Sequence, residues 1–439
     1  MKLMRCLIAP CTLLALGSGA PAAAEILPVG EEVPLAAGTV RSRLVSPAVA
    51  YSAAGEIVVA WEGFRQGLDG RRLDARGRPA GPEISLATNE LPPRVPYRGP
   101  MTLQREPTVV GLRGGALLAV WVEELHDVSV DVFYQRSELL RCTVVAQRLS
   151  PRGRQVGPQI VLSDDDLGLA GSPRVARLSD DRVLVVGHSA AEGAGEPGVY
   201  GRLLNHRGGP GEPAFRVDSP AGPPGSRPVV AAAEDGGFLV AWHGCCDSEG
   251  PGVFGRRYGA SAEPAGEPFL VNATEAGWQL RPELARGSAG EFLVAWLGPG
   301  DTESSLTYRV YGQVLAGDGT PLGPELALSD GGGRLHGAPA LVAAGDGYLA
   351  AWVVWKDDFP VAIVAAELDR NGAPIGDLLR VSSRPLGLQW RISLAGDGEG
   401  GYFAAWEGFD DQGSPSINTR RLTGTVRPSR SVELGAAGD

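Results

Sequence analysis

The sequence contains seven copies of one short pattern, and this repeat limits the possible folds more than any other feature. Six copies end an apolar run in a tryptophan, as in "EIVVAWEGF" and "FLVAWLGPG", and the copy "VLVVGHSAA" has Gly187 instead. The six tryptophans are Trp61, Trp121, Trp242, Trp296, Trp352 and Trp406. Successive copies lie 60, 66, 55, 54, 56 and 54 residues apart. Such a period is typical of propeller blades with four strands each.

Each copy also carries a signal for the start of its first strand. Five copies have a proline fourteen residues before the tryptophan position, and a sixth has one thirteen residues before it. These residues are Pro47, Pro107, Pro173, Pro228, Pro282 and Pro339, and the last copy has Ile392. A proline at the first residue of a strand removes no needed hydrogen bond, so we expect a strand to begin at each of them.

The last strand of each copy follows the form G-x-P-x-G-x-E, as in "GTPLGPELAL". Its first occurrence, at residues 29–35, precedes every tryptophan, and none follows Trp406. The N-terminal strand should therefore complete the last blade beside "INTRRLTGTV", which removes the exposed sheet edges. We predict an all-β, seven-bladed β-propeller over residues 25–428, followed by a flexible tail at 429–439. Because the tryptophans recur at one position, we expect them to pack between blades rather than to stack on sugars.

The alternation of "AW" strands with G-x-P-x-G-x-E strands resembles a repeat of secreted bacterial proteins, some of them large and attached to the cell surface. The resemblance covers nearly all of the chain after residue 24 and implies a propeller and export, but no reaction. The sequence lacks the Ser-x-Asp-x-Gly-x-Thr-Trp box of sialidases and the calcium loop of integrin-type propellers.

The N-terminus and the net charge restrict location and partners. The segment "MKLMRCLIAPCTLLALGSGAPAAAE" has Lys2 and Arg5 before an apolar run and small residues up to Ala24, so residues 1–24 are predicted to be a signal peptide. We expect an exported monomer, periplasmic or extracellular. A formal charge of −11 argues against a nucleic-acid partner. No later apolar run reaches the roughly 18 residues that a membrane span needs.

Charged residues gather on one predicted face of the propeller. The loops after the tryptophan positions and the segments before the prolines share this face, where binding sites are common. Each of these loops carries at least two carboxylates, which offer oxygen ligands for calcium. Just before the innermost strands stand Arg105, Arg227, Arg281 and Arg391. We predict a basic channel mouth that binds an anionic group, with acidic loops around it; the alternative is solvated loops with arginine–carboxylate pairs. No cofactor is predicted.

Blade two has the longest loop and the longest preceding link. The stretch "EELHDVSVDVFYQRSELLR" begins with Glu123 and Glu124 and contains His126 and Asp127, which we regard as candidate ligand-binding residues. The alternative is a surface insertion without a function, which loops accept at little cost.

Two histidines and two cysteines complete the candidates. His188 and His243 occupy the same position in neighbouring copies, but equivalent positions in stacked sheets lie about 10 Å apart, too far for one zinc ion unless the loops bend inward.

Cys245 and Cys246 are adjacent in "AWHGCCDSEG", and Cys142 should be too distant to pair with either. We predict a vicinal disulfide over a metal site, with two free thiols as the alternative.

Three functions are compatible with these observations. The leading hypothesis is an exported, non-enzymatic propeller that binds a protein, a glycan or a component of the cell envelope on its loop face. The second is a secreted carbohydrate-active hydrolase or lyase that uses loop carboxylates. The third is a structural or adhesive surface module. An enzyme should show a deep pocket with carboxylates in unequal environments, whereas a binding protein should show a shallow face with exposed aromatic residues.

Overall fold

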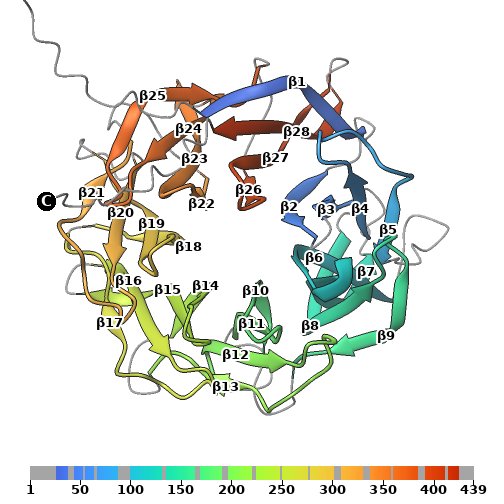
Figure 1. Cartoon of the computed structure of the whole chain (residues 1–439). Helices are drawn as coiled ribbons and strands as arrows, with labels where there is room; N and C mark the ends of the chain where they lie inside the picture. The colour runs from blue at the N-terminus through green and yellow to red at the C-terminus, as the bar shows by residue number, and fades with distance from the viewer. Residues whose placement is uncertain are drawn as a thin grey trace, which may run out of the picture.

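In the computed structural model, twenty-eight β-strands form seven four-stranded antiparallel sheets around a central axis (Figure 1). The sheets are the blades of a seven-bladed β-propeller, which confirms the predicted fold. The structure describes residues 26–37, 44–52, 55–63, 67–87, 99–130, 135–163, 169–189, 196–219, 224–247, 250–274, 277–300, 308–329, 337–356, 359–383, 391–410 and 414–424. The predicted signal peptide and C-terminal tail lie outside these residues. Within them, no helix is long and apolar enough to cross a membrane.

In blades one to six the strands run outward from the axis in chain order, and in blade seven the N-terminal strand takes the outermost place. Blades one to four consist of β2 (Val45–Tyr51), β3 (Ile57–Glu62), β4 (Leu68–Leu73) and β5 (Ile84–Ala87); β6 (Gly99–Gly111), β7 (Leu117–Val130), β8 (Gln135–Leu149) and β9 (Gln155–Val161); β10 (Gly171–Arg177), β11 (Val183–Ser189), β12 (Gly198–Leu204) and β13 (Phe215–Arg216); and β14 (Gly225–Ala232), β15 (Phe238–Asp247), β16 (Gly250–Tyr258) and β17 (Phe269–Leu270). Blades five to seven consist of β18 (Leu280–Arg286), β19 (Phe292–Pro299), β20 (Tyr308–Leu315) and β21 (Leu326–Ala327); β22 (Ala340–Ala344), β23 (Gly347–Lys356), β24 (Phe359–Leu368) and β25 (Pro374–Arg380); and β26 (Ile392–Gly396), β27 (Gly401–Phe409), β28 (Pro415–Gly424) and β1 (Ile26–Ala37). A 3₁₀ turn, η1 (Arg113–Gly115), joins β6 to β7.

The N-terminal strand closes the ring, as the sequence predicts. β1 is the outermost strand of blade seven and pairs with β28, from Ile26 opposite Gly424 to Ala37 opposite Ser416. One oxygen of the Glu32 carboxylate accepts hydrogen bonds from the backbone N–H and the hydroxyl of Ser383 at 2.9 and 2.8 Å. This contact ties the closing strand to the end of blade six.

Seven apolar clusters form the core, one between each pair of neighbouring blades. All six repeated tryptophans are buried, with 0–3% of their surface exposed, which confirms their packing role. In the third copy, a β-carbon on Gly187 would lie 3.1 Å from the buried side chain of Leu169. Leu169 therefore fills the space that tryptophan occupies in the other blades.

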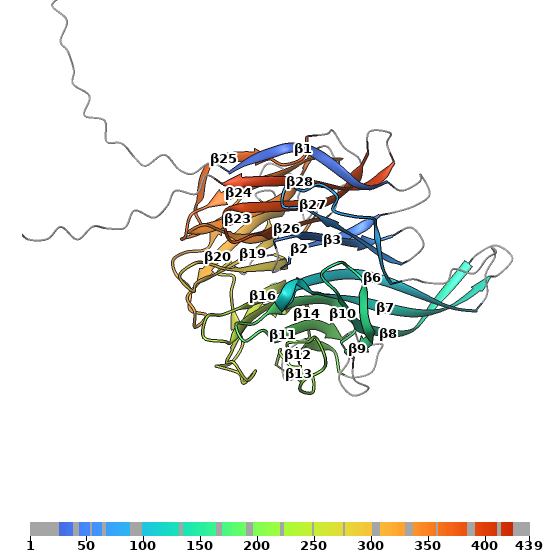
Figure 2. The same ribbon diagram turned by 45° about the vertical axis from the view of Figure 1, so that its right-hand side comes forward.

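Blade two departs from the predicted pattern. The stretch expected to be a long loop is instead an extension of β7 and β8 that projects from the ring (Figure 2). The start of β6 pairs with it, from Gly99 opposite Val128 to Arg105 opposite Val122. The three strands together form an arm rather than a flexible loop, because their backbone groups are paired.

Candidate functional site

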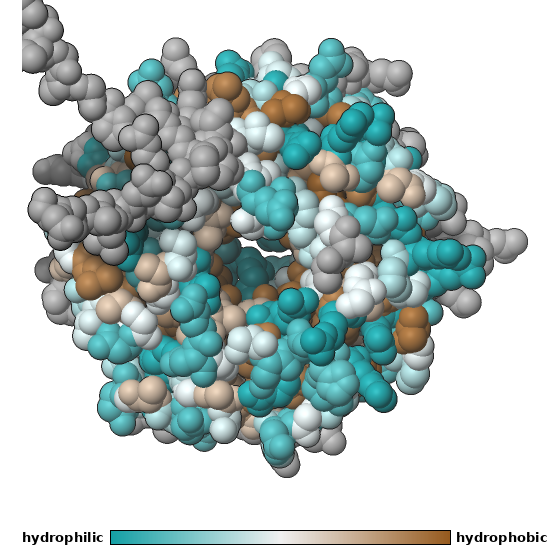
Figure 3. Space-filling model, viewed as in Figure 1, coloured by the Kyte–Doolittle hydropathy of each residue, from teal (hydrophilic) through white to brown (hydrophobic). Residues whose placement is uncertain are grey.

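Residues from all seven blades meet in one pocket at the axis of the propeller. Each blade contributes the residue directly before the proline, or before Ile392 in blade seven, and we call these seven the axial residues. They are Ser46, Glu106, Ser172, Arg227, Arg281, Ala338 and Arg391. The pocket also includes Arg174 and Glu283, one residue after the proline of their blades, and has a volume of about 260 Å³. We call it the central pocket. In the space-filling view, the ring is open at its centre, with hydrophilic residues inside (Figure 3).

A β-bulge directs the axial side chains inward. In five blades the axial residue has a positive φ between 46° and 56°, and the pairing of the innermost strand with its neighbour shifts at that point. In these five blades the proline therefore lies at a bulge within the innermost strand rather than at its first residue, whereas Pro339 directly precedes β22. A positive φ is uncommon for residues with a β-carbon and is maintained only where the surrounding structure imposes it.

Carboxylates of the preceding blade fix three of these bulges. Glu407 accepts a hydrogen bond from the backbone N–H of Ser46 at 2.8 Å, and Glu62 accepts one from that of Glu106 at 2.9 Å. Glu106 in turn accepts bonds from the backbone N–H of Ser172 at 2.9 Å and from its hydroxyl at 3.1 Å. The acids that follow two tryptophans in the sequence thus join neighbouring blades, and they are not free to form an acidic rim.

Positive charge exceeds negative charge in the central pocket, where four guanidinium groups face two carboxyl groups. Arg174 lies 3.5 Å from Glu283, and Arg391 donates a hydrogen bond to the hydroxyl of Ser46 at 2.5 Å. Arg227 and Arg281 are half-buried, and among the described residues neither has a hydrogen-bond or ion-pair partner. Burial lowers the pKa of both, and repulsion from Arg391 lowers it further. Both remain charged at neutral pH, because the ordinary pKa of arginine lies far above neutrality.

The two carboxyl groups of the pocket are in unequal environments. Burial alone would raise the pKa of Glu106, but the three nearest guanidinium groups and the N–H of Ser172 reverse this effect and lower it. Burial raises the pKa of Glu283, and the single neighbouring cation, Arg174, only partly opposes it. At one pH, Glu106 is therefore the more readily ionised group and Glu283 the more readily protonated one.

The sequence-predicted arginines do not all lie together. Arg227, Arg281 and Arg391 line the central pocket, as the predicted basic mouth requires. Arg105 does not line it, and its Nε instead lies 2.8 Å from the carboxylate of Glu124. The axial residue of blade two is Glu106. Aligning the copies on their prolines would have identified it, since it directly precedes Pro107. Arg174 and Glu283 carried no comparable signal.

The acidic candidates of blade two lie on β7, in the arm. Glu124 contacts both Arg105 and the Nε2 of His126, the latter at 3.0 Å, and the other ring nitrogen of His126 lies 3.0 Å from the hydroxyl of Ser137. Glu123 accepts a hydrogen bond from Gln159 at 3.0 Å. Asp127 pairs in register with Glu138 on β8. Most of these polar groups are thus occupied by one another.

His188 and His243 lie beside the pocket arginines. Burial lowers the pKa of His188, and burial followed by the charges of Arg227 and Arg281 lowers that of His243 to about 4. Two imidazoles do not complete a zinc site, and among the described residues no three His, Cys, Asp or Glu side chains are grouped to hold a metal. Several of the acidic loops lie outside those residues, so the calcium hypothesis stays a prediction.

The cysteines are only partly described. Cys142 is half-buried, and its thiol donates to the backbone oxygen of Ala170. The backbone of Cys245 and Cys246 belongs to β15, but their side chains lie outside the described part of the structure. The vicinal disulfide therefore stays a prediction.

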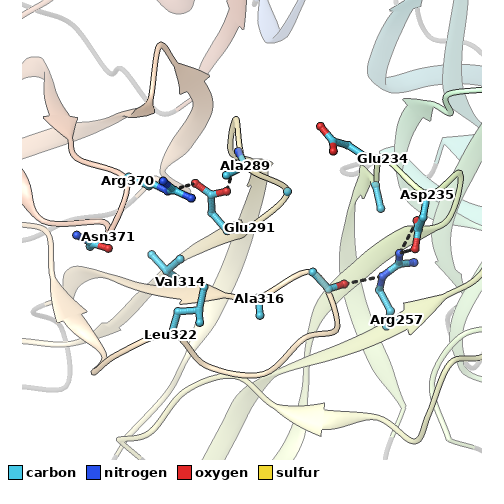
Figure 4. A pocket seen from close by; sticks show the side chains of 13 residues that line it. Glu234, Asp235, Arg257, Ala289, Glu291, Val314, Ala316, Leu322, Arg370 and Asn371 are labelled. Atoms are coloured by element: carbon cyan, nitrogen blue, oxygen red, sulfur yellow. Dashed lines mark hydrogen bonds and ion pairs between the residues drawn. The ribbon is translucent and has the colours of Figure 1, made fainter. Parts of the chain in front are cut away.

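A second pocket of about 400 Å³ lies among the hairpin turns of blades four to six (Figure 4). We call it the hairpin pocket. Both oxygens of Asp235 lie 2.6 Å from Nη2 of Arg257, and Glu291 lies 3.5 Å from Arg370. Its charged groups are therefore paired across the pocket wall, in contrast to Arg227 and Arg281 of the central pocket.

Comparisons with known proteins find only distant structural likenesses. No family model and no curated protein sequence matches the chain. Similar solved structures include a protein of unknown function from Dyadobacter fermentans (10% identity, TM-score 0.48, 91% of this chain and 99% of that one). Another is an α-L-arabinofuranosidase of Fusarium graminearum with arabinobiose (11% identity, TM-score 0.48, 90% of this chain and 98% of that one). A third is the NanB sialidase of Streptococcus pneumoniae (7% identity, TM-score 0.47, 90% of this chain and 70% of that one). Likenesses this distant give no information about the chemistry of this chain.

Proposed function

We propose that this protein hydrolyses glycosidic bonds and that the central pocket is its active site. The observation that carries the proposal is a pair of carboxyl groups, Glu106 and Glu283, that line one pocket in unequal environments: three guanidinium charges act on Glu106, and only that of Arg174 acts on Glu283. Enzymes that cleave glycosidic bonds use one protonated and one ionised carboxyl group. Two groups in different environments supply both forms at a single pH.

The roles of the two groups follow from their protonation. Glu283 donates its proton to the oxygen of the departing sugar as the bond from that oxygen to the anomeric carbon breaks. Glu106 takes a proton from a water molecule, whose oxygen forms the new bond to that carbon. One water is consumed, and exchange with solvent returns both carboxyl groups to their starting forms. Ser172 holds one oxygen of Glu106, and the other lies 4.0 Å from Arg391.

The structure supports this hypothesis over the non-enzymatic binding protein that the sequence alone favoured. A binding face should expose several aromatic side chains, but among the described residues only Trp278 is an exposed aromatic residue. The acid–base pair also differs from the one expected, because the two carboxyl groups belong to the innermost strands and not to the variable loops. Export remains part of the proposal and depends on residues 1–24.

The test is an activity assay on the chain without residues 1–24. Neutral, acidic and amino polysaccharides are incubated with it, and newly formed reducing ends are measured. We expect Glu283→Gln and Glu106→Gln to lower kcat by about 10²- to 10⁴-fold, the usual contribution of acid–base catalysis. Glu212→Gln, at an exposed position in blade three, is the matched control and should retain full activity.

Three results would contradict the proposal. One is the absence of cleavage across the whole set of polysaccharides, and another is an unchanged rate in Glu283→Gln. The third is a product in which every new end carries a double bond, since this would show elimination instead of hydrolysis.

A further inference from the structure

We propose that the saccharide bound in the central pocket carries an oxyanion, a carboxylate or a sulfate, and that Arg227 and Arg281 bind this group. The inference rests on the proposed function and adds the chemical class of its substrate. The central pocket contains four guanidinium groups and two carboxyl groups, so its net charge is positive and suits an anionic ligand.

Arg227 and Arg281 line the same pocket, and neither has a hydrogen-bond or ion-pair partner among the described residues. By contrast, two other arginines that are largely removed from water have carboxylate partners: Arg216 lies 2.7 Å from Asp218, and Arg257 lies 2.6 Å from Asp235. Charged groups removed from water are normally paired. Arg227 and Arg281 are half-buried, lie in neighbouring blades and repel each other, which lowers the pKa of Arg281. An anion placed between them would relieve this repulsion.

The fold itself does not require arginine at these positions. The equivalent axial residue is a serine in blades one and three and an alanine in blade six. Arg227 and Arg281 also have positive φ values of 49° and 56°, a conformation that costs roughly 1–2 kcal/mol for residues with a β-carbon. Backbone conformation therefore explains neither side chain, whereas recognition of an anion explains both. Guanidinium groups bind carboxylates and sulfates through two parallel hydrogen bonds.

The position of the oxyanion relative to the cleaved bond follows from β18. Arg281 and Glu283 are two residues apart at the start of this strand, so their Cα atoms are at most roughly 7 Å apart, the span of two fully extended residues. Both side chains line the pocket. An oxyanion held by Arg281 therefore lies within one sugar ring of the oxygen that Glu283 protonates. We infer that the charged group belongs to a sugar directly at the cleaved bond.

Binding and cleavage are measured separately to test this. Calorimetry compares the binding of galacturonate oligosaccharides, sulfated galactose oligosaccharides and neutral galactose oligosaccharides to Glu283→Gln, which binds but does not cleave. We expect one of the two charged ligands to bind at least tenfold more tightly than the neutral one. Adding Arg227→Met or Arg281→Met should weaken that binding by about 10- to 100-fold, the effect of losing a charged hydrogen bond. Arg76→Met, at an exposed hairpin residue, is the matched control.

Two variants that keep the positive charge test whether misfolding, rather than a lost contact, explains weaker binding. Arg227→Lys and Arg281→Lys should unfold at the same temperature as the wild type and bind the charged ligand with intermediate affinity, because lysine lacks the planar pair of donors. Preference for sulfate or for carboxylate supports the proposal equally and identifies the oxyanion. Equal affinity for charged and neutral ligands, or binding unaffected by Arg227→Met and Arg281→Met, would overturn it.

The two proposals fail in different ways. If charged saccharides bind through the arginines but the wild type never cleaves them, the hydrolase proposal is wrong and the inference about the oxyanion stands. If the wild type and Arg281→Met cleave a neutral saccharide equally well, the hydrolase proposal stands and the inference is wrong.

Discussion

The central pocket and the hairpin pocket contain the same kinds of charged residues in opposite arrangements. In the hairpin pocket, Arg257 donates to Asp235 and to the backbone oxygens of Phe238 and Gly317, so its guanidinium is satisfied within the protein (Figure 4). In the central pocket, Arg227 and Arg281 have no such partners among the described residues. The larger of the two cavities is therefore the one whose charges are already neutralised.

This difference separates structural charges from functional ones. A paired and buried guanidinium contributes to folding, because its removal leaves several acceptors without a donor. An unpaired one contributes little to folding or opposes it, so its presence in a pocket is better explained by binding than by stability. Cavity volume alone would have directed attention to the hairpin pocket, whereas charge balance directs it to the axis.

The largest stability effect is expected in the hairpin pocket. Arg257 is 7% exposed, and Arg257→Met removes every hydrogen bond to its carboxylate and carbonyl partners. We expect the free energy of unfolding to fall by about 3 kcal/mol in urea titrations. Saccharide binding should not change. A loss of less than about 1 kcal/mol would show that the two pockets do not differ in the way described.

A second effect, of roughly 2–3 kcal/mol, should appear as a pH dependence next to the central pocket. The pKa of His243 is about 4 in the folded protein and about 6.5 in the unfolded chain. The unfolded chain therefore binds more protons between these values, and the free energy of unfolding should decrease as the pH falls from 6.5 toward 4. His243→Gln should reduce this slope. If the wild type and His243→Gln lose the same free energy of unfolding between pH 6.5 and pH 4, His243 is not the group responsible.

The sequence predicted the ring well because its signals repeat. A tryptophan in six blades and a proline in six copies locate the second and first strands, and the early G-x-P-x-G-x-E strand predicts the closure by β1. Each signal reflects packing or backbone geometry that every blade shares. The missing tryptophan at Gly187 did not disturb the fold, because Leu169 fills its place.

The site was predicted less completely, because it depends on single residues at a bulge. Successive strand residues point to opposite faces, so an error of one position exchanges an axial side chain for a peripheral one. This is the difference between Glu106 and Arg105. Arg174 and Glu283 become recognisable only when the bulge directs them toward the axis. The arm of blade two was also missed, because it stands where a variable loop follows the tryptophan in the other copies, although three valines within residues 128–132 alternate with polar residues as in a strand.

A smaller effect of opposite sign is expected when an unpaired charge is removed. Arg281→Met relieves the repulsion between Arg281 and Arg227 and fills the same space with an apolar side chain. We expect the free energy of unfolding to rise by about 0.5 kcal/mol, while affinity for the charged saccharide falls. Arg370→Met in the hairpin pocket serves as the comparison, because it removes the cation 3.5 Å from Glu291 and should lower stability. A loss of stability in Arg281→Met would mean that this side chain has a structural role.

The smallest effect is a shift of the pH–activity profile in Arg174→Met. Arg174 lowers the pKa of Glu106 and also that of Glu283, from which it lies 3.5 Å. Without it both pKa values rise, so Glu106 needs a higher pH to become ionised and Glu283 keeps its proton to a higher pH. Both limbs of a bell-shaped profile of kcat/KM should therefore move upward by a fraction of a pH unit. Arg370→Met should leave the profile unchanged, because its charge acts on the other pocket. A shift in only one limb would show that only one of the two glutamates takes part in catalysis.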